Sequence, residues 1–165
     1  MKDKVKKWLD RNTPCGFPWD RVLKSCSWTA IFGTLWSLTF FASYNNFYGR
    51  LFDSWGNGTR ILKDGAIMAE FTTIIDGKLI FFRLLVIAMV FLVGYQYNYH
   101  FQGSKSIYLM KRLPRRSELW RRCLVFPVTL ALISEAFAIA LRMIFFAYYM
   151  IRTPEVCLVP GQGIW

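Results

Sequence analysis

Three long apolar blocks constrain what this chain can fold into more than any other feature of its sequence. They cover residues 26–44, 79–99 and 123–151, and 55% of the 165 residues are hydrophobic. A helix rises about 1.5 Å per residue, so about 20 apolar residues are enough to cross about 30 Å of hydrocarbon. Soluble domains do not normally gather their apolar residues in blocks of this length. The sequence therefore predicts an all-α integral membrane protein with three transmembrane helices, one in each block.

The charged residues lie mostly at the ends of these blocks. The chain has 21 Lys and Arg against 10 Asp and Glu, which gives a net charge of +11. The charges follow the block ends rather than one helical face, and this argues against a nucleic-acid-binding protein. Segments 1–25 and 100–122 have seven basic residues each, whereas 45–78 and 152–165 have four and one. By the positive-inside rule we expect the first two segments in the cytoplasm and the other two outside.

Two of the segments outside the blocks have a helical pattern of their own. Segment 1–25 begins with apolar residues on one helical face among lysines, which predicts an amphipathic helix on the inner membrane surface. It lacks the early apolar run and the cleavage site of a secretory signal. In segment 45–78, Phe47, Leu51 and Trp55 recur at helical spacing. They predict a second interfacial helical turn or a re-entrant piece.

No catalytic constellation is visible in the sequence. His100 is the single histidine, and we expect an interfacial side chain there rather than a metal ligand. The four cysteines have neither paired spacing nor a metal-ligand pattern. We expect Cys157, alone on the outer side, to be free or to pair between chains. The sequence also lacks a phosphate-binding glycine loop. It therefore predicts a protein that is not an enzyme and that holds no cofactor or metal of its own.

Three charged residues lie inside the predicted spans: Arg83, Glu135 and Arg142. Glu135 and Arg142 are seven residues apart and therefore share one helical face. Charges at such depths are costly and usually face protein or a water-filled cavity. Two interpretations stay open. The charges line a polar pathway or an interface with another chain, or they pair internally while the arginines reach toward the membrane surface.

The segment 108–122, which reads YLMKRLPRRSELWRR, contains six basic residues between two apolar blocks. Such a segment can anchor topology, bind lipid phosphates or dock a soluble partner. Pro114 disfavours helix at Leu113 and suits the first turn of a helix that follows. The segment therefore predicts a sharp elbow between the second and third spans.

The order of the predicted elements and the YLMKRLPRRSELWRR segment together resemble the permease subunits of type-2 ABC exporters. In that family a cytoplasmic elbow with a coupling helix joins the second and third spans and rests in a groove of a separate ATPase subunit. The resemblance implies that an ATPase docks on Tyr108, Lys111, Arg112, Leu113, Pro114, Arg115, Arg116, Glu118 and Trp120. The chain has fewer predicted spans than a full permease subunit of that family. The resemblance therefore implies a half-size subunit that assembles with other permease subunits in a hetero-oligomer.

The resemblance also implies an ATP-driven transporter in a bacterial cytoplasmic membrane, with ATP and magnesium held by the partner ATPase. Glu135 and Arg142 would then belong to the polar interior or to a subunit interface. An alternative from a different class is a small non-transport membrane protein. It would be a holin-like pore former, or a scaffold that recruits cytoplasmic partners or anionic lipid through its basic loop.

Overall fold

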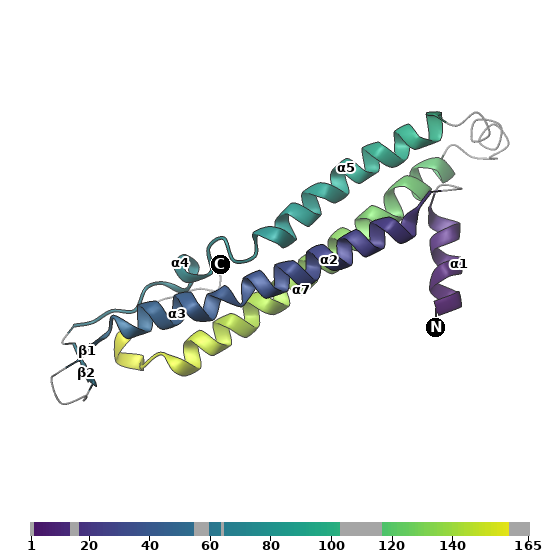
Figure 1. Ribbon diagram of the computed structural model, residues 1–165. Helices are drawn as coiled ribbons and strands as arrows, with labels where there is room; N and C mark the ends of the chain where they lie inside the picture. Colours follow the sequence, from purple (N-terminus) through teal and green to yellow (C-terminus); the bar gives the residue numbers. More distant parts are fainter. Residues whose placement is uncertain (1, 14–16, 55–59, 64, 103–116, 159–165) are drawn as a thin grey trace. The chain divides into compact units, whose positions relative to one another are not determined.

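The computed structural model describes residues 2–13, 17–54, 60–63, 65–102 and 117–158, which are mostly helical (Figure 1). The chain divides into two compact units. Unit 1 contains Met1–Ile31 and Phe81–Ala136, and unit 2 contains Phe32–Ile80 and Phe137–Trp165. The elements in chain order are α1 (Lys2–Asn12), α2 (Trp19–Ser37), α3 (Thr39–Gly49), β1 (Phe52–Ser54), β2 (Arg60–Leu62), α4 (Phe71–Ile75), α5 (Ile80–Gln102), α7 (Ser117–Arg152) and the 3-10 turn η1 (Glu155–Cys157).

Unit 1 is built around a small apolar cluster that joins its helices. Its buried centre consists of Leu9 of α1, Phe17 just before α2, and Phe126 of α7. Leu92 of α5 packs against this centre. The rings of Phe17 and Phe126 meet edge-on with centroids 6.5 Å apart. Within this unit α5 and α7 lie side by side and run antiparallel (Figure 1). The helix predicted in 1–25 is present as α1, whereas its position at a membrane surface stays a prediction.

The first apolar block does not form one uninterrupted helix. It begins in α2 and continues in α3, and the two helices are separated at Leu38. The N–H of Leu38 is shared between the Thr34 carbonyl at 3.3 Å and the Leu35 carbonyl at 3.2 Å, and the N–H of Phe41 donates to the Leu38 carbonyl at 3.1 Å. The hydroxyls of Ser37 and Thr39 each donate to the carbonyl three residues back. Hydroxyls that bond to the backbone in this way often bend helices, and two of them flank this break.

Two helices in the described part of the chain are long and apolar enough to cross a membrane, over Ile80–Asn98 and Trp120–Arg152. They correspond to the predicted spans 79–99 and 123–151. The predicted span 26–44 is not among them and is not confirmed. The break at Leu38 divides it, and the serines and threonines of α2 make it less apolar than the other two blocks.

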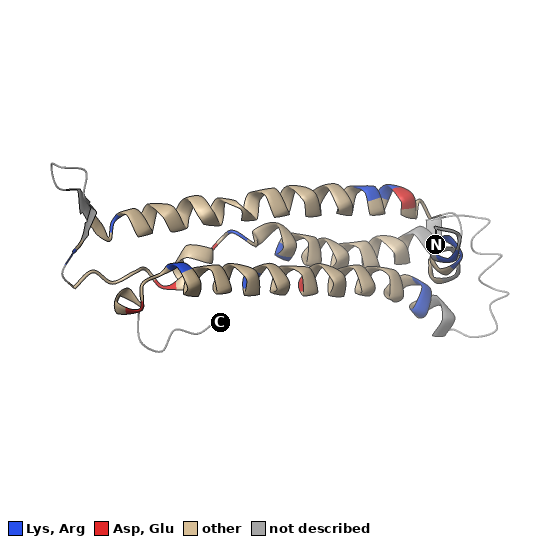
Figure 2. Cartoon of the chain, turned by 90° about the horizontal axis from the view of Figure 1, so that it is seen from below, with Lys and Arg blue, Asp and Glu red and all other residues tan. Residues whose placement is uncertain are grey.

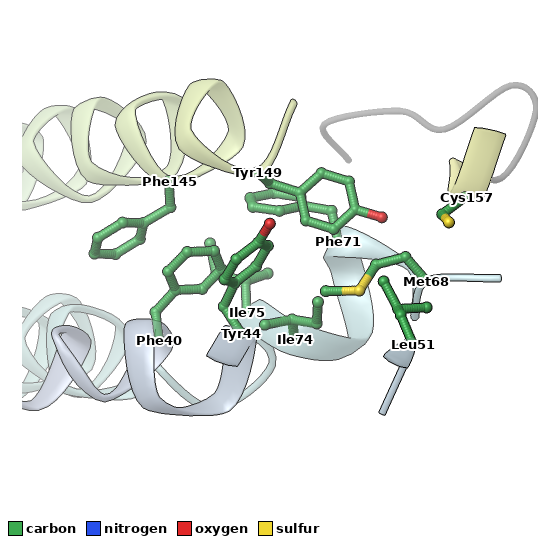
Figure 3. Packing of buried hydrophobic residues seen from close by; sticks show 10 residues of the cluster. All are labelled: Phe40, Tyr44, Leu51, Met68, Phe71, Ile74, Ile75, Phe145, Tyr149 and Cys157. Carbon is green, nitrogen blue, oxygen red and sulfur yellow. The ribbon is translucent and has the colours of Figure 1, made fainter. Parts of the chain in front are cut away.

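Unit 2 is held together by buried aromatic side chains (Figure 3). Phe40 of α3 stacks on Phe145 of α7, with ring centroids 4.6 Å apart and planes inclined by 16°. Phe71 of α4 meets Phe40 edge-on at 6.1 Å. Tyr44 and Tyr149 are both buried, with centroids 6.1 Å apart. Each such pair contributes about 0.5–1.5 kcal/mol beyond the area it buries, so together the rings fix α3, α4 and α7 within this unit.

The polar tips of these buried tyrosines have partners. The Tyr149 hydroxyl donates to the Ala69 carbonyl at 3.0 Å. The Tyr44 hydroxyl lies 3.2 Å from the Thr153 hydroxyl, and either can be the donor. A buried tyrosine hydroxyl without a partner would cost about 1–3 kcal/mol, so these two bonds allow the aromatic cluster to include tyrosines.

The 3-10 turn η1 joins the same cluster through Cys157. This side chain is buried beside Leu51 and Met68 (Figure 3), and its thiol is free. Its backbone carbonyl accepts a hydrogen bond of 2.9 Å from the N–H of Met68. Both alternatives that the sequence leaves open for Cys157, a free thiol or a pair between chains, stay predictions. A disulfide to another chain would require this turn to open.

The segment that follows α3 differs from its prediction. The helix ends at Gly49, and β1 and β2 form a short antiparallel hairpin in which Phe52 pairs with Leu62. Leu51 is buried in the unit 2 cluster. The prediction of a second helical turn is therefore wrong beyond Gly49, because pairing with a strand that comes later in the chain satisfies the backbone there. Trp55 lies outside the described residues.

Candidate functional site

Most of the predicted docking segment lies outside the described residues. This is the case for Tyr108, Lys111, Arg112, Leu113, Pro114, Arg115 and Arg116. Helix α7 begins at Ser117, inside the stretch that we predict to be helical after the proline, and Glu118 belongs to its first turn. Trp120 is the one predicted docking residue whose side chain the structure describes.

An aromatic pair joins the end of α5 to the beginning of α7. The rings of Tyr97 and Trp120 are stacked, with centroids 5.9 Å apart and planes inclined by 29°. Trp120 is 55% exposed, so one part of the ring remains accessible to a partner. The sequence connects these two helix ends through residues 103–116. The pair therefore holds both ends of the basic connection close together.

The middle parts of the long helices carry few charged residues (Figure 2). The exceptions are Arg83 on α5 and Glu135 and Arg142 on α7. Arg83 and Glu135 are exposed, and Arg142 is half-buried. Glu135 and Arg142 both belong to α7, which runs from Ser117 to Arg152. Among the residues that the structure describes, Glu135 has no ion-pair partner, and both interpretations of these charges stay predictions.

Two buried polar side chains of unit 1 were not recognised from the sequence. Gln96 on α5 is 0% exposed, and neither its amide nitrogen nor its amide oxygen has a hydrogen-bond partner among the described residues. Ser134 on α7 is also buried, and its hydroxyl has no partner there either. A buried donor or acceptor without a partner costs about 1–3 kcal/mol. These positions are therefore places where unit 1 is less stable than an all-apolar interior would be.

Helical spacing is the signal that could have identified Gln96. It follows Phe82, Leu85 and Met89 at intervals that place all four residues on one face of a helix, and all four are buried. Ser134 likewise follows Phe126 and Leu130 on α7 at intervals of four, and these residues belong to the apolar cluster of unit 1 or pack against it. A polar residue on the buried face of an apolar helix is less common than a polar residue on its exposed face, and so more informative.

The packed part of α7 in unit 1 also contains a proline. Pro127 lies inside the helix and is fully buried. Its ring nitrogen has no hydrogen, so it cannot donate to the carbonyl of Cys123 four residues earlier. The Cys123 side chain is buried as well, with its thiol free. This stretch of α7 therefore combines a missing helical hydrogen bond with the unpartnered side chain of Ser134 two turns further on.

The chemistry available to the described residues is limited. No group of three or more His, Cys, Asp or Glu side chains gathers in the residues that the structure places. The hydroxyls of α2 mostly bond to their own helix, as Ser27 does to the Leu23 carbonyl at 2.8 Å and Thr29 to the Ser25 carbonyl at 3.0 Å. The features that stand out are thus the ends of α5 and α7, the exposed charges and the unpartnered polar groups.

No protein-family profile, no curated protein and no solved structure matches the chain.

Proposed function

We propose that the chain is a transmembrane subunit of an ATP-driven transporter. It contributes part of a translocation pathway and docks a separate ATPase through residues 104–122. The observation that carries the proposal is the arrangement at one end of α5 and α7. The rings of Tyr97 and Trp120 stack between the adjacent ends of two helices of membrane length. A proline-containing segment rich in basic residues connects them.

The small buried fraction of the two long helices supports insertion into a membrane. In each membrane-length window only 22% of the residues are buried, whereas the core helix of a soluble protein is mostly buried. The remaining surface carries large exposed apolar side chains, among them Leu84, Ile87, Val90 and Phe91 on α5 and Leu132, Ile133 and Ile144 on α7. Contiguous apolar surface of this kind marks contact with a membrane or a partner protein.

The distribution of basic residues supports one orientation. With α2 and α3 as a third, interrupted crossing, segments 1–25 and 100–122 lie in the cytoplasm, and they have seven basic residues each. The C-terminal end of α7 then lies outside. In a bacterial cell this membrane is the cytoplasmic membrane, and the basic segment faces the compartment that holds ATP.

The proposed mechanism is transmission of movement. When the ATPase dimer closes on ATP, it displaces the basic segment. Because Tyr97 and Trp120 hold the two helix ends together, the displacement reaches α5 and α7 jointly rather than one helix alone. The basic side chains pair with acidic groups of the ATPase, which favours correct and rapid docking more than it adds affinity.

Co-purification from native membranes tests the proposal. The tagged wild-type chain is compared with an Arg115→Glu, Arg116→Glu variant, and bound proteins are identified by mass spectrometry. We expect an ATPase subunit with nucleotide-binding motifs to accompany the wild type and to be lost from the variant. A Lys4→Glu, Lys6→Glu variant is the matched control. It changes the net charge by the same amount in the other cytoplasmic segment and should keep the ATPase.

Two results would speak against the proposal. Absence of an ATPase from the wild type, under conditions that preserve known membrane complexes, removes the transporter interpretation. Equal loss of the ATPase from both variants means that general charge, and not the elbow, attracts it. Release of a trapped dye from vesicles that contain the purified chain alone would instead favour the pore former.

A further inference from the structure

One face of α5 presents a line of exposed residues along the membrane-length part of the helix. These residues are Arg83, Ile87, Val90 and Gly94, at alternating intervals of four and three. That spacing keeps them on a single face. Apart from its chain neighbours and the backbone of its own helix turn, a Cβ atom added at Gly94 would meet nothing within 4 Å, so the face is open at this point. We call these residues the α5 line.

Helix α7 presents a comparable line of exposed residues. It consists of Leu124, Val128, Leu132 and Glu135, at intervals of four, four and three. Leu132 is 65% exposed. The α7 line therefore resembles the α5 line. Each is a row of apolar residues with one charged residue at the end farther from the Tyr97 and Trp120 rings, and the two charges have opposite signs.

The two lines lie at matching depths because the stack of Tyr97 on Trp120 fixes the register of the antiparallel helices. Arg83 precedes Tyr97 by 14 residues and Glu135 follows Trp120 by 15, which places both charges roughly 21–23 Å from the stack. By the same reckoning Val90 lies level with Val128, and Gly94 lies level with Leu124, each to within about 1.5 Å.

We propose that the α5 line of one copy of this chain packs against the α7 line of a second copy in the membrane. Copies inserted in the same direction are related by a rotation about the membrane normal, and this rotation leaves the depth of every residue unchanged. Arg83 of one copy therefore meets Glu135 of the other. Val90 meets Val128, and Leu124 fills the open position at Gly94.

The opposite charges of Arg83 and Glu135 identify a second copy of the chain as the partner that covers the two lines. Glu135 and Arg83 are both exposed, and among the described residues neither has an ion-pair partner. A charge that faces lipid is costly, and charges within membranes are usually paired. One chain carries both members of a guanidinium–carboxylate pair at one depth, on two helices whose apolar positions also correspond. The inference rests on the membrane-spanning part of the proposed function and is independent of the ATPase.

Disulfide cross-linking between two copies tests the interface with the charges left intact. All four native cysteines are replaced by alanine, and a Val90→Cys chain is co-expressed with a Val128→Cys chain that carries a larger tag. Membranes are oxidised, and the mixed dimer is measured on a non-reducing gel. The control pair is Leu84→Cys with Ile133→Cys. These residues are exposed and level with each other, but they lie off the two lines.

The expected result is at least tenfold more mixed dimer from the Val90 and Val128 pair than from the control pair. Equal or absent cross-linking in the two pairs overturns the interface, including the case in which another membrane protein is recovered with the chain instead. Extraction of the wild type from membranes by alkaline carbonate overturns the membrane proposal and this inference together. Retention in the membrane without the specific cross-link overturns this inference alone.

A charge exchange provides a second test that distinguishes pairing between copies from pairing within one chain. Arg83→Glu and Glu135→Arg each place like charges at the interface, and we expect each variant alone to associate at least about tenfold more weakly than the wild type. When the two variants are co-expressed with different tags, both charge pairs are restored between the copies. Recovery of association in the mixture supports the interface, and association of each single variant at the wild-type level overturns it.

Discussion

Replacement of Gln96 by methionine is the substitution whose effect follows most directly from the structure. The side chain is fully buried on α5, and neither polar atom of its amide has a partner among the described residues. A buried polar group without a hydrogen bond costs about 1–3 kcal/mol. Methionine is similar in length and flexibility, has no strong hydrogen-bonding group and adapts to irregular apolar space. We therefore expect Gln96→Met to raise the free energy of unfolding by about 1–3 kcal/mol.

The measurement is unfolding of the purified protein in mixed micelles with increasing sodium dodecyl sulfate, followed by circular dichroism. Asn98→Met is the matched control. It makes a similar change two residues further along α5, at an exposed position, and should leave the stability nearly unchanged. A hydrogen bond contributes about 1 kcal/mol to stability. If Gln96→Met lowers the free energy of unfolding by that amount or more, the amide has a hydrogen-bond partner and the reasoning from burial fails.

Three further predictions concern unit 2. Phe145→Ala removes the ring that stacks on Phe40 and should lower the free energy of unfolding by about 3–5 kcal/mol, whereas Ile144→Ala, at a residue 59% exposed, should have little effect in detergent unfolding. Tyr44→Phe and Thr153→Val should show a coupling energy of about 0.5–1.5 kcal/mol in a double-mutant cycle, because their two hydroxyls share one hydrogen bond. If the effects of the two substitutions on the free energy of unfolding simply add, that hydrogen bond is refuted. The third prediction uses proteins with a single cysteine and a maleimide reagent. Cys157 is 1% exposed and should be labelled only on unfolding, whereas a cysteine introduced by Val156→Cys, at a position 87% exposed, should be labelled at once. Equal labelling rates would show that η1 opens in the native protein.

The two long helices could be predicted because their signal is local. Blocks 79–99 and 123–151 are apolar over a membrane-spanning length despite a few charged residues and Pro127, and they correspond to α5 and α7. The break at Leu38 could not be predicted from apolar content alone. It depends on where the hydroxyls of Ser37 and Thr39 find acceptors, and such hydroxyls also occur in unbroken helices. The hairpin after Gly49 depends on pairing with a later strand, which helical spacing does not report.

The candidate site likewise has features that are visible in the sequence and features that depend on contacts between distant residues. The charges Arg83 and Glu135 are visible in the sequence, but their common depth follows only from the contact of Tyr97 with Trp120. Gln96 is visible as a polar residue in an apolar block, and only burial shows that its amide has no partner. The docking residues from Tyr108 to Arg116 lie outside the described residues, so their role stays a prediction from the resemblance.

The stack of Phe40 on Phe145 has a consequence for the order of events during biosynthesis. The two rings are about 100 residues apart in the chain, so at about 5–20 residues per second a ribosome makes them about 5–20 seconds apart. During that interval the aromatic residues of α3 and α4 have no α7 to pack against. This surface therefore stays uncovered by α7 until the last long helix of the nascent chain arrives. A ribosome that stalls before Phe145 therefore leaves a product that quality-control proteases can recognise by its unburied rings.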